Sequence, residues 1–245
     1  PWRFSTFDYR ELCALLWEGC GEARFETATV SGRSAGAGGS IVVHTDRGDL
    51  QAPLVVDALG WRRVLSTAPH AIQPPKATLS RGLEVHPAAT GRDLELWIDP
   101  RYVPKGYSWA FPAGDEVRIG VGSLDPREHV REPTVRLAHD NGVPADGFQG
   151  NWIPHKLRRA TEDGVFFVGD SAGHCIPATA EGIRPALYFG VACGRELRMV
   201  IEGRQARAQA LERYDSRSEE KRYAYRSMLR AQRFVGRATP YPLMT

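Results

Sequence analysis

The chain has 245 residues, of which 42% are hydrophobic and 25% charged, a balance that excludes disordered, collagen-like and fibrous classes. No apolar stretch approaches the roughly 18 to 20 residues that cross a bilayer, and residues 1–10 lack the apolar core of a signal peptide, so we expect a cytoplasmic protein. The net charge of only +3 gives no reason to expect a nucleic-acid partner.

The first part of the chain combines one helix with strand-like segments. Apolar residues at helical spacing predict a helix over Phe7–Gly19, with Asp8 as its cap. The glycine-rich run Gly32–Ser40 is followed by β-branched residues and not by a helix, which predicts a hairpin loop and argues against a dinucleotide-binding turn. Alternating residues predict strands over 23–30, 41–45 and 50–58.

The middle of the chain changes character. Alternating segments separated by Pro, Gly and Asp turns predict an antiparallel sheet between Lys76 and Gly122, and this sheet carries most of the large aromatic residues. A polar helix (127–139) and a strand (148–154) follow. The remaining predictions are a short apolar strand, a mostly buried helix and one long polar helix, over 165–168, 182–202 and 205–236.

Strands of parallel type therefore flank strands of antiparallel type, which indicates one domain interrupted by another. The predicted fold class is α/β with mixed α+β character: a partial FAD/NAD(P)-binding, Rossmann-like domain interrupted by an antiparallel-sheet substrate domain, followed by C-terminal helices. The expected boundaries are 1–66 and 159–204 for the two parts of the first domain, 67–158 for the inserted domain and 205–245 for the terminal helix.

The segment Val165–Leu187 carries the strongest chemical pattern. A buried strand that ends in Gly-Asp places the Asp170 carboxylate at the edge where open α/β sheets bind ligands. The helix that opens near Gly182 offers free N–H groups and the positive end of its dipole to an electron-rich group. These features fit the ribityl chain and the reduced ring of a flavin, and they equally fit a capped turn before a core helix.

The run GDSAGHCIPATAEGIR resembles the second flavin-contact motif of the flavoprotein hydroxylase and geranylgeranyl reductase superfamily. The resemblance implies an FAD cofactor. Ala180 departs from the pattern, because the family usually has glycine there. The implied cofactor-binding residues are Gly169, Asp170, Ala172, Gly173, Pro177, Glu181, Gly182 and Ile183.

The sequence PKGYSWAFP, Pro104–Pro112, is similar to the substrate-cavity motif of geranylgeranyl reductases. On a strand, alternate residues share a face, so Tyr107, Trp109 and Phe111 form one apolar wall. By itself, an aromatic stripe of period two is typical of plain core. With the resemblance, these three residues and Pro112 are the expected substrate-binding residues.

VVDALGWRRVL, Val55–Leu65, occupies the place of an Asp-Gly pair that serves flavin and nicotinamide nucleotide in the hydroxylases. Here Leu59 precedes Gly60, which resembles the reductase form more closely and argues against hydroxylase-type handling of NADPH. Gly60 is expected to bind the cofactor through close backbone approach, with a simple turn glycine as the alternative.

Other chemistry is not indicated. The cysteines (Cys13, Cys20, Cys175, Cys193) have no paired CxxC spacing, so we expect reduced thiols, and the scattered histidines have no ligand spacing, so we expect no metal. His174 alone lies within a motif, where it either tunes the site or is a solvated loop residue.

The last predicted helix is the basic part of the chain. From Arg204 to Arg237, ten basic residues stand against four acidic ones, a net +6. A solvated face is one interpretation. The other is a surface for anionic lipid headgroups, or for the pyrophosphate of a prenyl substrate, which would place the protein at the periphery of a membrane.

The resemblance implies an FAD-dependent oxidoreductase that transfers hydride between flavin N5 and a hydrophobic, isoprenoid-type substrate, with FAD held between the two domains and with NAD(P)H or a reduced carrier as electron donor. Its catalytic residues are unknown. The alternatives are a flavin-dependent monooxygenase or halogenase of the same fold, and a non-catalytic remnant that acts through its basic helix. Because no GxGxxG segment is present, we expect the chain to be an incomplete portion of such an enzyme.

Overall fold

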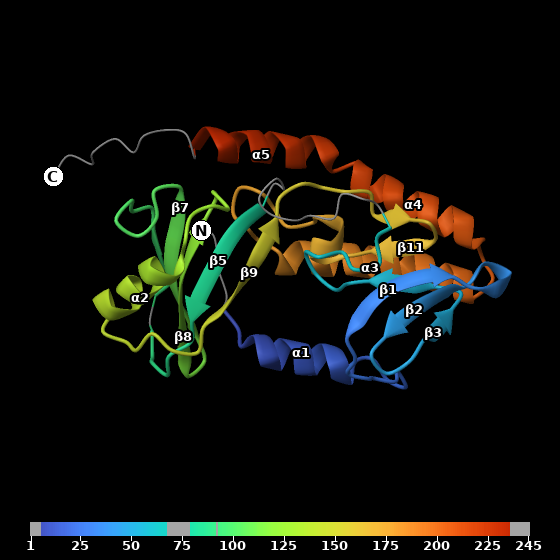
Figure 1. Ribbon diagram of the computed structural model, residues 1–245, viewed down its shortest axis with the longest axis horizontal. Helices are drawn as coiled ribbons and strands as arrows, with labels where there is room; N and C mark the ends of the chain where they lie inside the picture. Colours follow the sequence, from blue (N-terminus) through green and yellow to red (C-terminus); the bar gives the residue numbers. More distant parts are fainter. Residues whose placement is uncertain (1–5, 68–78, 92, 236–245) are drawn as a thin grey trace. The chain divides into compact units, whose positions relative to one another are not determined.

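The computed structural model describes residues 6–67, 79–91 and 93–235 (Figure 1). These residues form two compact units, one from the described parts of 1–27 and 81–151 and the other from the described parts of 28–80 and 152–235. Each unit has its own hydrophobic core, so each is described separately.

The first unit is built on a five-stranded antiparallel sheet in the order β6-β7-β8-β5-β9. Its strands are β5 (Leu79–Val85), β6 (Glu95–Trp97), β7 (Gly106–Ala113), β8 (Glu116–Ser123) and β9 (Gln149–Pro154). Helix α2 (Arg131–Asp140) contributes Leu137 and Ala138 to the same core as Ile119 and Val121 of β8. This unit also contains α1 (Tyr9–Glu18), which begins after Asp8, whose carboxylate accepts the backbone N–H of Arg10 as predicted.

The second unit contains two three-stranded sheets, in the orders β1-β2-β3 and β10-β11-β4. The strands are β1 (Val30–Ala35), β2 (Ile41–Thr45), β3 (Leu50–Ala52), β4 (Val55–Asp57), β10 (Thr161–Glu162) and β11 (Val165–Phe167). Two 3-10 turns, η1 (Ala37–Gly39) and η2 (Gly169–Ala172), and three helices, α3 (Ile183–Ile201), α4 (Arg207–Glu219) and α5 (Arg222–Val235), complete it. Its core is centred on β11, whose three residues are fully buried.

The pairing of these strands confirms the predicted sheet types. β1 and β2 form an antiparallel hairpin, so the hairpin interpretation is confirmed, but residues 32–35 of the predicted loop belong to β1 and the loop itself is residues 36–40. β11 pairs with β4 in parallel, Val165 with Val55 and Phe167 with Asp57. Strands separated by more than a hundred residues in sequence thus end at the same edge, because parallel neighbours share one direction.

Three local predictions were wrong. Residues 23–29 form no strand, because no strand among the described residues pairs with them and pairing begins only at Val30. The segment predicted as one strand over 50–58 is divided into β3 and β4, which belong to different sheets.

The terminal helix predicted over 205–236 is two helices, α4 and α5, interrupted at Glu220 and Lys221 (Figure 1). No glycine or proline marks this break in the sequence. Residues 76–78 of the predicted sheet region and Gly236 of the predicted helix lie outside the described residues.

None of the described helices is long and apolar enough to cross a membrane. The described residues also contain no group of His, Cys, Asp or Glu side chains placed to hold a metal ion. All four cysteines are free thiols.

Candidate functional site

The parallel pair β4 and β11 builds the frame of the predicted cofactor site. Asp57, the last residue of β4, is fully buried and accepts three hydrogen bonds, from Leu59 N (2.9 Å), Leu65 N (2.8 Å) and Ser171 Oγ (2.6 Å). Ser171 Oγ also lies 3.0 Å from the carbonyl oxygen of Gly60. The turn after β4 is thereby joined to the motif that follows β11.

Gly60 itself has a φ of +83°, a conformation that favours glycine. A β-carbon at this position would meet no described atom within 4 Å. Glycine is therefore favoured at position 60 by the backbone conformation of the turn and not by crowding from the described residues around it.

The Gly169–Gly173 turn explains the small residues of the motif. Gly169 and Gly173 have φ of +64° and +67°. A β-carbon on Gly173 would lie 2.1 Å from the carbonyl oxygen of Lys156, and Ala172 between them is fully buried. The motif is thus a tight structural turn as well as a candidate binding loop.

Asp170 is a polar side chain of this turn that has no hydrogen-bond partner among the described residues. Its carboxylate receives no hydrogen bond from the described residues, and burial raises its pKa to about 6. A β-carbon at Gly182 would lie 3.7 Å from Asp170 Oδ1, so the carboxylate is next to the N-terminus of α3. Gly182 caps that helix without a side-chain hydrogen bond. The structure therefore brings together the two features that the sequence singled out, a carboxylate and a helix N-terminus.

The other motif residues have different surroundings. Glu181 forms an ion pair with Arg184 (2.6 Å between Oε1 and Nε), and its backbone bridges to Ile176, which closes the loop. Pro177 is buried, whereas Ile183 is 42% exposed at the start of α3.

Ala180 has a φ of +54°, in the left-handed region. This conformation costs a residue with a β-carbon about 1 to 2 kcal/mol, which gives a physical reason for the family's glycine at this position.

His174 is not a solvated loop residue, and that interpretation was wrong. Its side chain is fully buried, is stacked on Phe189 with 3.6 Å between ring centroids, and lies with Nε2 3.1 Å from Ser218 Oγ. Burial and the nearby Arg63 charge lower its pKa to about 3. The imidazole is neutral at physiological pH and is part of the core.

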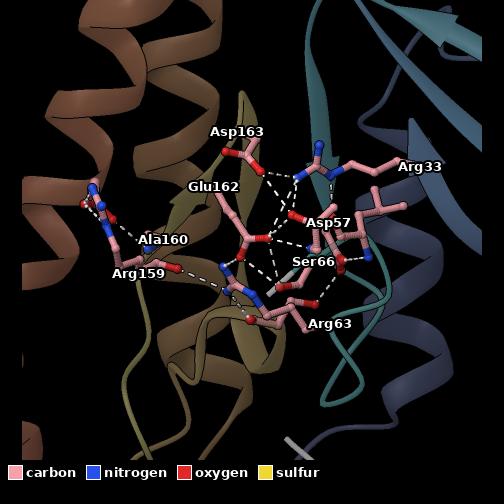
Figure 2. Close-up of polar contacts among 12 residues, drawn as sticks. Arg33, Asp57, Arg63, Ser66, Arg159, Ala160, Glu162 and Asp163 are labelled. Atoms are coloured by element: carbon pink, nitrogen blue, oxygen red, sulfur yellow. Dashed lines mark hydrogen bonds and ion pairs between the residues drawn. The ribbon is translucent and has the colours of Figure 1, made fainter. Parts of the chain in front are cut away.

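A buried ion-pair network beneath the turn was missed by the sequence analysis (Figure 2). The Arg63 guanidinium lies 3.5 Å from the Phe167 ring centroid and donates to the carbonyl oxygen of Ser171 (2.7 Å) and to Glu162 Oε2 (3.2 Å). Burial opposes ionisation of Glu162, yet hydrogen bonds from Ser66 and Thr67, together with Arg63, lower its pKa to about 2. The only sequence signal is an arginine three residues after the Gly60 turn, and nothing in it indicates burial.

In the other unit, the predicted aromatic wall exists on β7. Ring centroids are 5.6 Å apart for Tyr107 and Trp109, and 6.4 Å apart for Trp109 and Phe111. The alternating residues Ser108 and Ala110 are the buried ones. The aromatic face is thus the face opposite to the core, which rejects the plain-core interpretation.

Two further groups shape that face. Trp109 Nε1 donates to Glu84 Oε2 (3.2 Å), and its indole covers Gly120 of β8, where a β-carbon would lie 2.3 Å from the ring. Leu96 of the edge strand β6 is paired with Trp109 and is 55% exposed, so the apolar surface continues to the sheet edge. Pro112 falls on the opposite face of β7 by the alternation of the strand.

Comparison with known proteins shows what the chain resembles. No family model matches the chain. A digeranylgeranylglycerophospholipid reductase of Methanococcus vannielii is 30% identical over 131 residues, which cover 50% of this chain and 34% of the relative. The chain is therefore similar over half of its length to a digeranylgeranylglycerophospholipid reductase. It spans about a third of the length of that curated relative.

Two solved structures of flavoprotein-type enzymes share the fold of this chain. A geranylgeranyl bacteriochlorophyll reductase-like protein from Thermoplasma acidophilum has a TM-score of 0.77 at 17% identity, covering 94% of this chain and 63% of its own. A flavin-dependent halogenase from Xanthomonas campestris has a TM-score of 0.68 at 15% identity, covering 96% of this chain and 48% of its own. At these identities the likeness concerns the fold alone.

Proposed function

We propose that the protein is an FAD-dependent oxidoreductase of the geranylgeranyl reductase type, which saturates carbon–carbon double bonds of a hydrophobic, isoprenoid-type substrate. The observation that carries this proposal is the Asp170 carboxylate, which is half-buried, has no donor among the described residues and lies beside the N-terminus of α3. Its oxygen atoms are therefore available to accept hydrogen bonds from a ligand.

The residues of this site suit a flavin. Asp170 would accept hydrogen bonds from sugar-alcohol hydroxyls of the ribityl chain, and the N–H groups of Gly182 and Ile183 at the start of α3 would favour the negative charge of the reduced ring. Gly60, Gly169 and Gly173 allow the neighbouring turns to be tight, because glycine, which has no β-carbon, adopts positive φ angles without strain. Ala172, Pro177 and Glu181 would hold the loop in shape. Bound flavin would supply the hydride.

The sheet unit would supply the substrate surface, in keeping with the proposed role of residues 67–158. Tyr107, Trp109 and Phe111 present an apolar wall that suits a hydrocarbon chain, and Glu84 holds the Trp109 indole in place through its Nε1–H. NAD(P)H or a reduced carrier protein would provide the electrons. Leu59 in place of an acidic residue favours a nucleotide-handling mode unlike that of the hydroxylases.

The test has two stages. In the first, the protein is titrated with FAD and binding is followed by quenching of flavin fluorescence. Saturable binding is expected, and absence of binding would leave only the non-catalytic remnant. In the second, the dithionite-reduced complex is given a geranylgeranyl lipid without oxygen, and mass spectrometry is expected to show one added hydrogen pair per reduced double bond.

A flavin-dependent monooxygenase or halogenase is the second candidate, and the structural likeness to the Xanthomonas halogenase favours keeping it. The two are separated by adding oxygen and substrate to the reduced complex. Product that contains oxygen or halide, formed as fast as oxygen is consumed, would replace the reductase proposal.

A further inference from the structure

Helix α5 contacts the loop that follows β11 through two polar side chains. The Tyr225 hydroxyl donates to the carbonyl oxygen of His174, and the Gln232 side-chain amide donates to the carbonyl oxygen of Pro177. Both side chains are 7% exposed. They are seven residues apart, which is two helical turns, so they lie on the same side of α5. This helix therefore holds the loop at two points between Asp170 and Gly182.

Helix α4 adds contacts to the same segment. Tyr214 is fully buried and donates to the carbonyl oxygen of Phe167 (2.9 Å), and Ser218 Oγ lies 3.1 Å from His174 Nε2. The break at Glu220 and Lys221 allows Ser218 and Tyr225 to reach the same histidine from two helices. The loop is consequently fixed by the C-terminal helices as well as by its own turns.

The opposite side of α5 has another character. Tyr223 and Phe234 are 80% and 74% exposed near its two ends. Between them Arg226, Arg230 and Arg233 are also exposed, at steps of three and four residues that keep them on one side. Helix α5 contains no acidic residue.

A cationic stripe flanked by exposed aromatic rings suits one kind of partner best. Anionic headgroups neutralise the arginines, while Tyr and Phe side chains enter the boundary between headgroups and acyl chains. An acidic protein would use the charges but would have no comparable role for both aromatic rings.

We infer that α5 docks on an anionic lipid surface and that docking stabilises the loop of residues 170–182. Tyr225 and Gln232 join one face of α5 to the loop, while the other face would contact the lipid. Restricting the motion of α5 therefore also restricts the motion of the loop. The link to cofactor affinity rests on the proposed flavin site. If the loop holds flavin, thermodynamic reciprocity requires the lipid surface and the flavin to strengthen each other's binding by the same factor.

The first experiment measures sedimentation of the protein with vesicles of equal parts phosphatidylserine and phosphatidylcholine, and with vesicles of phosphatidylcholine alone. Binding to the anionic vesicles is expected to fall about fivefold for each arginine removed in R226Q/R230Q. The matched control is R195Q/R198Q, two exposed arginines of α3, which should bind as the wild type does. Equal binding to neutral vesicles, or equal loss in the control, would overturn the inference.

The second experiment follows amide hydrogen exchange of residues 170–182 with and without anionic vesicles. Exchange is expected to slow at least threefold in the wild type, whereas Tyr225→Phe should bind vesicles normally and lose this protection. Vesicle binding without any change in exchange would refute the coupling. Since neither measurement needs flavin, failure of flavin binding would refute the proposed function and leave this inference to be decided separately.

Discussion

Replacement of Asp170 by asparagine should stabilise the protein while weakening the proposed flavin site. Burial raises the pKa of Asp170 from 3.8 to about 6, so the ionised carboxylate is disfavoured in the folded state. Two pKa units at about 1.4 kcal/mol each correspond to about 3 kcal/mol. Asparagine has nearly the same shape and carries no charge, so it avoids this penalty.

The pH dependence follows from proton binding. Between pH 3.8 and about 6 the folded state binds more protons at Asp170 than the unfolded state, so stability falls as pH rises through this window. Below the window the wild type and Asp170→Asn should be equally stable. Above it the variant should be more stable by about 2 to 3 kcal/mol.

Urea unfolding near the two ends of that window, with Asp146→Asn as a control at an exposed carboxylate, measures this difference. Flavin titration of the same proteins should show an affinity about 10 to 100 times lower for Asp170→Asn, because a charge-assisted hydrogen bond is lost. A variant that is less stable than the wild type above pH 6, or a difference that does not change with pH, would refute the assignment of Asp170 as a half-buried carboxylate without a donor among the described residues.

Three further substitutions test the local geometry, each by urea unfolding. Ala180→Gly should raise stability by about 0.5 to 1 kcal/mol, because glycine relieves the left-handed φ; a loss of stability would contradict the observed backbone. Gly173→Ala should lower the free energy of unfolding by about 3 kcal/mol or more, because its β-carbon would collide with the backbone. The control Gly203→Ala, at a similar φ with open space around it, should lower it by only about 1 kcal/mol. Equal losses would mean that the site around Gly173 is not crowded. Glu162→Gln should cost about 2 kcal/mol, because it leaves the Arg63 charge buried without its partner, and no change would show that the pair is solvated.

The aromatic wall and the turn of residues 169–173 were predictable because each depends on residues that are close in the sequence. Alternation along a strand places Tyr107, Trp109 and Phe111 on one face wherever the strand is. Which face is covered is not local information, and only the packing of Ser108 and Ala110 into the core decides it.

Other features had no counterpart in the sequence. The break at Glu220 and Lys221 carries no helix-terminating residue, and the burial of His174 depends on Phe189 and Ser218, which lie on other elements. Arginine is usually found on protein surfaces. Arg63 can be buried only because Glu162 and two backbone carbonyl oxygens accept its hydrogen bonds and compensate for the lost hydration.

The sequence by itself determined the elements whose periodicity and turn residues agree, including the short strand that precedes the Asp170 turn and the helix that begins after Gly182. The tertiary structure alone decided that β4 and β11 are parallel neighbours, that Asp170 lies beside Gly182, and that α5 holds the intervening loop. The physical reason is that side-chain periodicity reports which face of an element is apolar, whereas the partner that covers this face is selected by contacts between residues far apart in the chain.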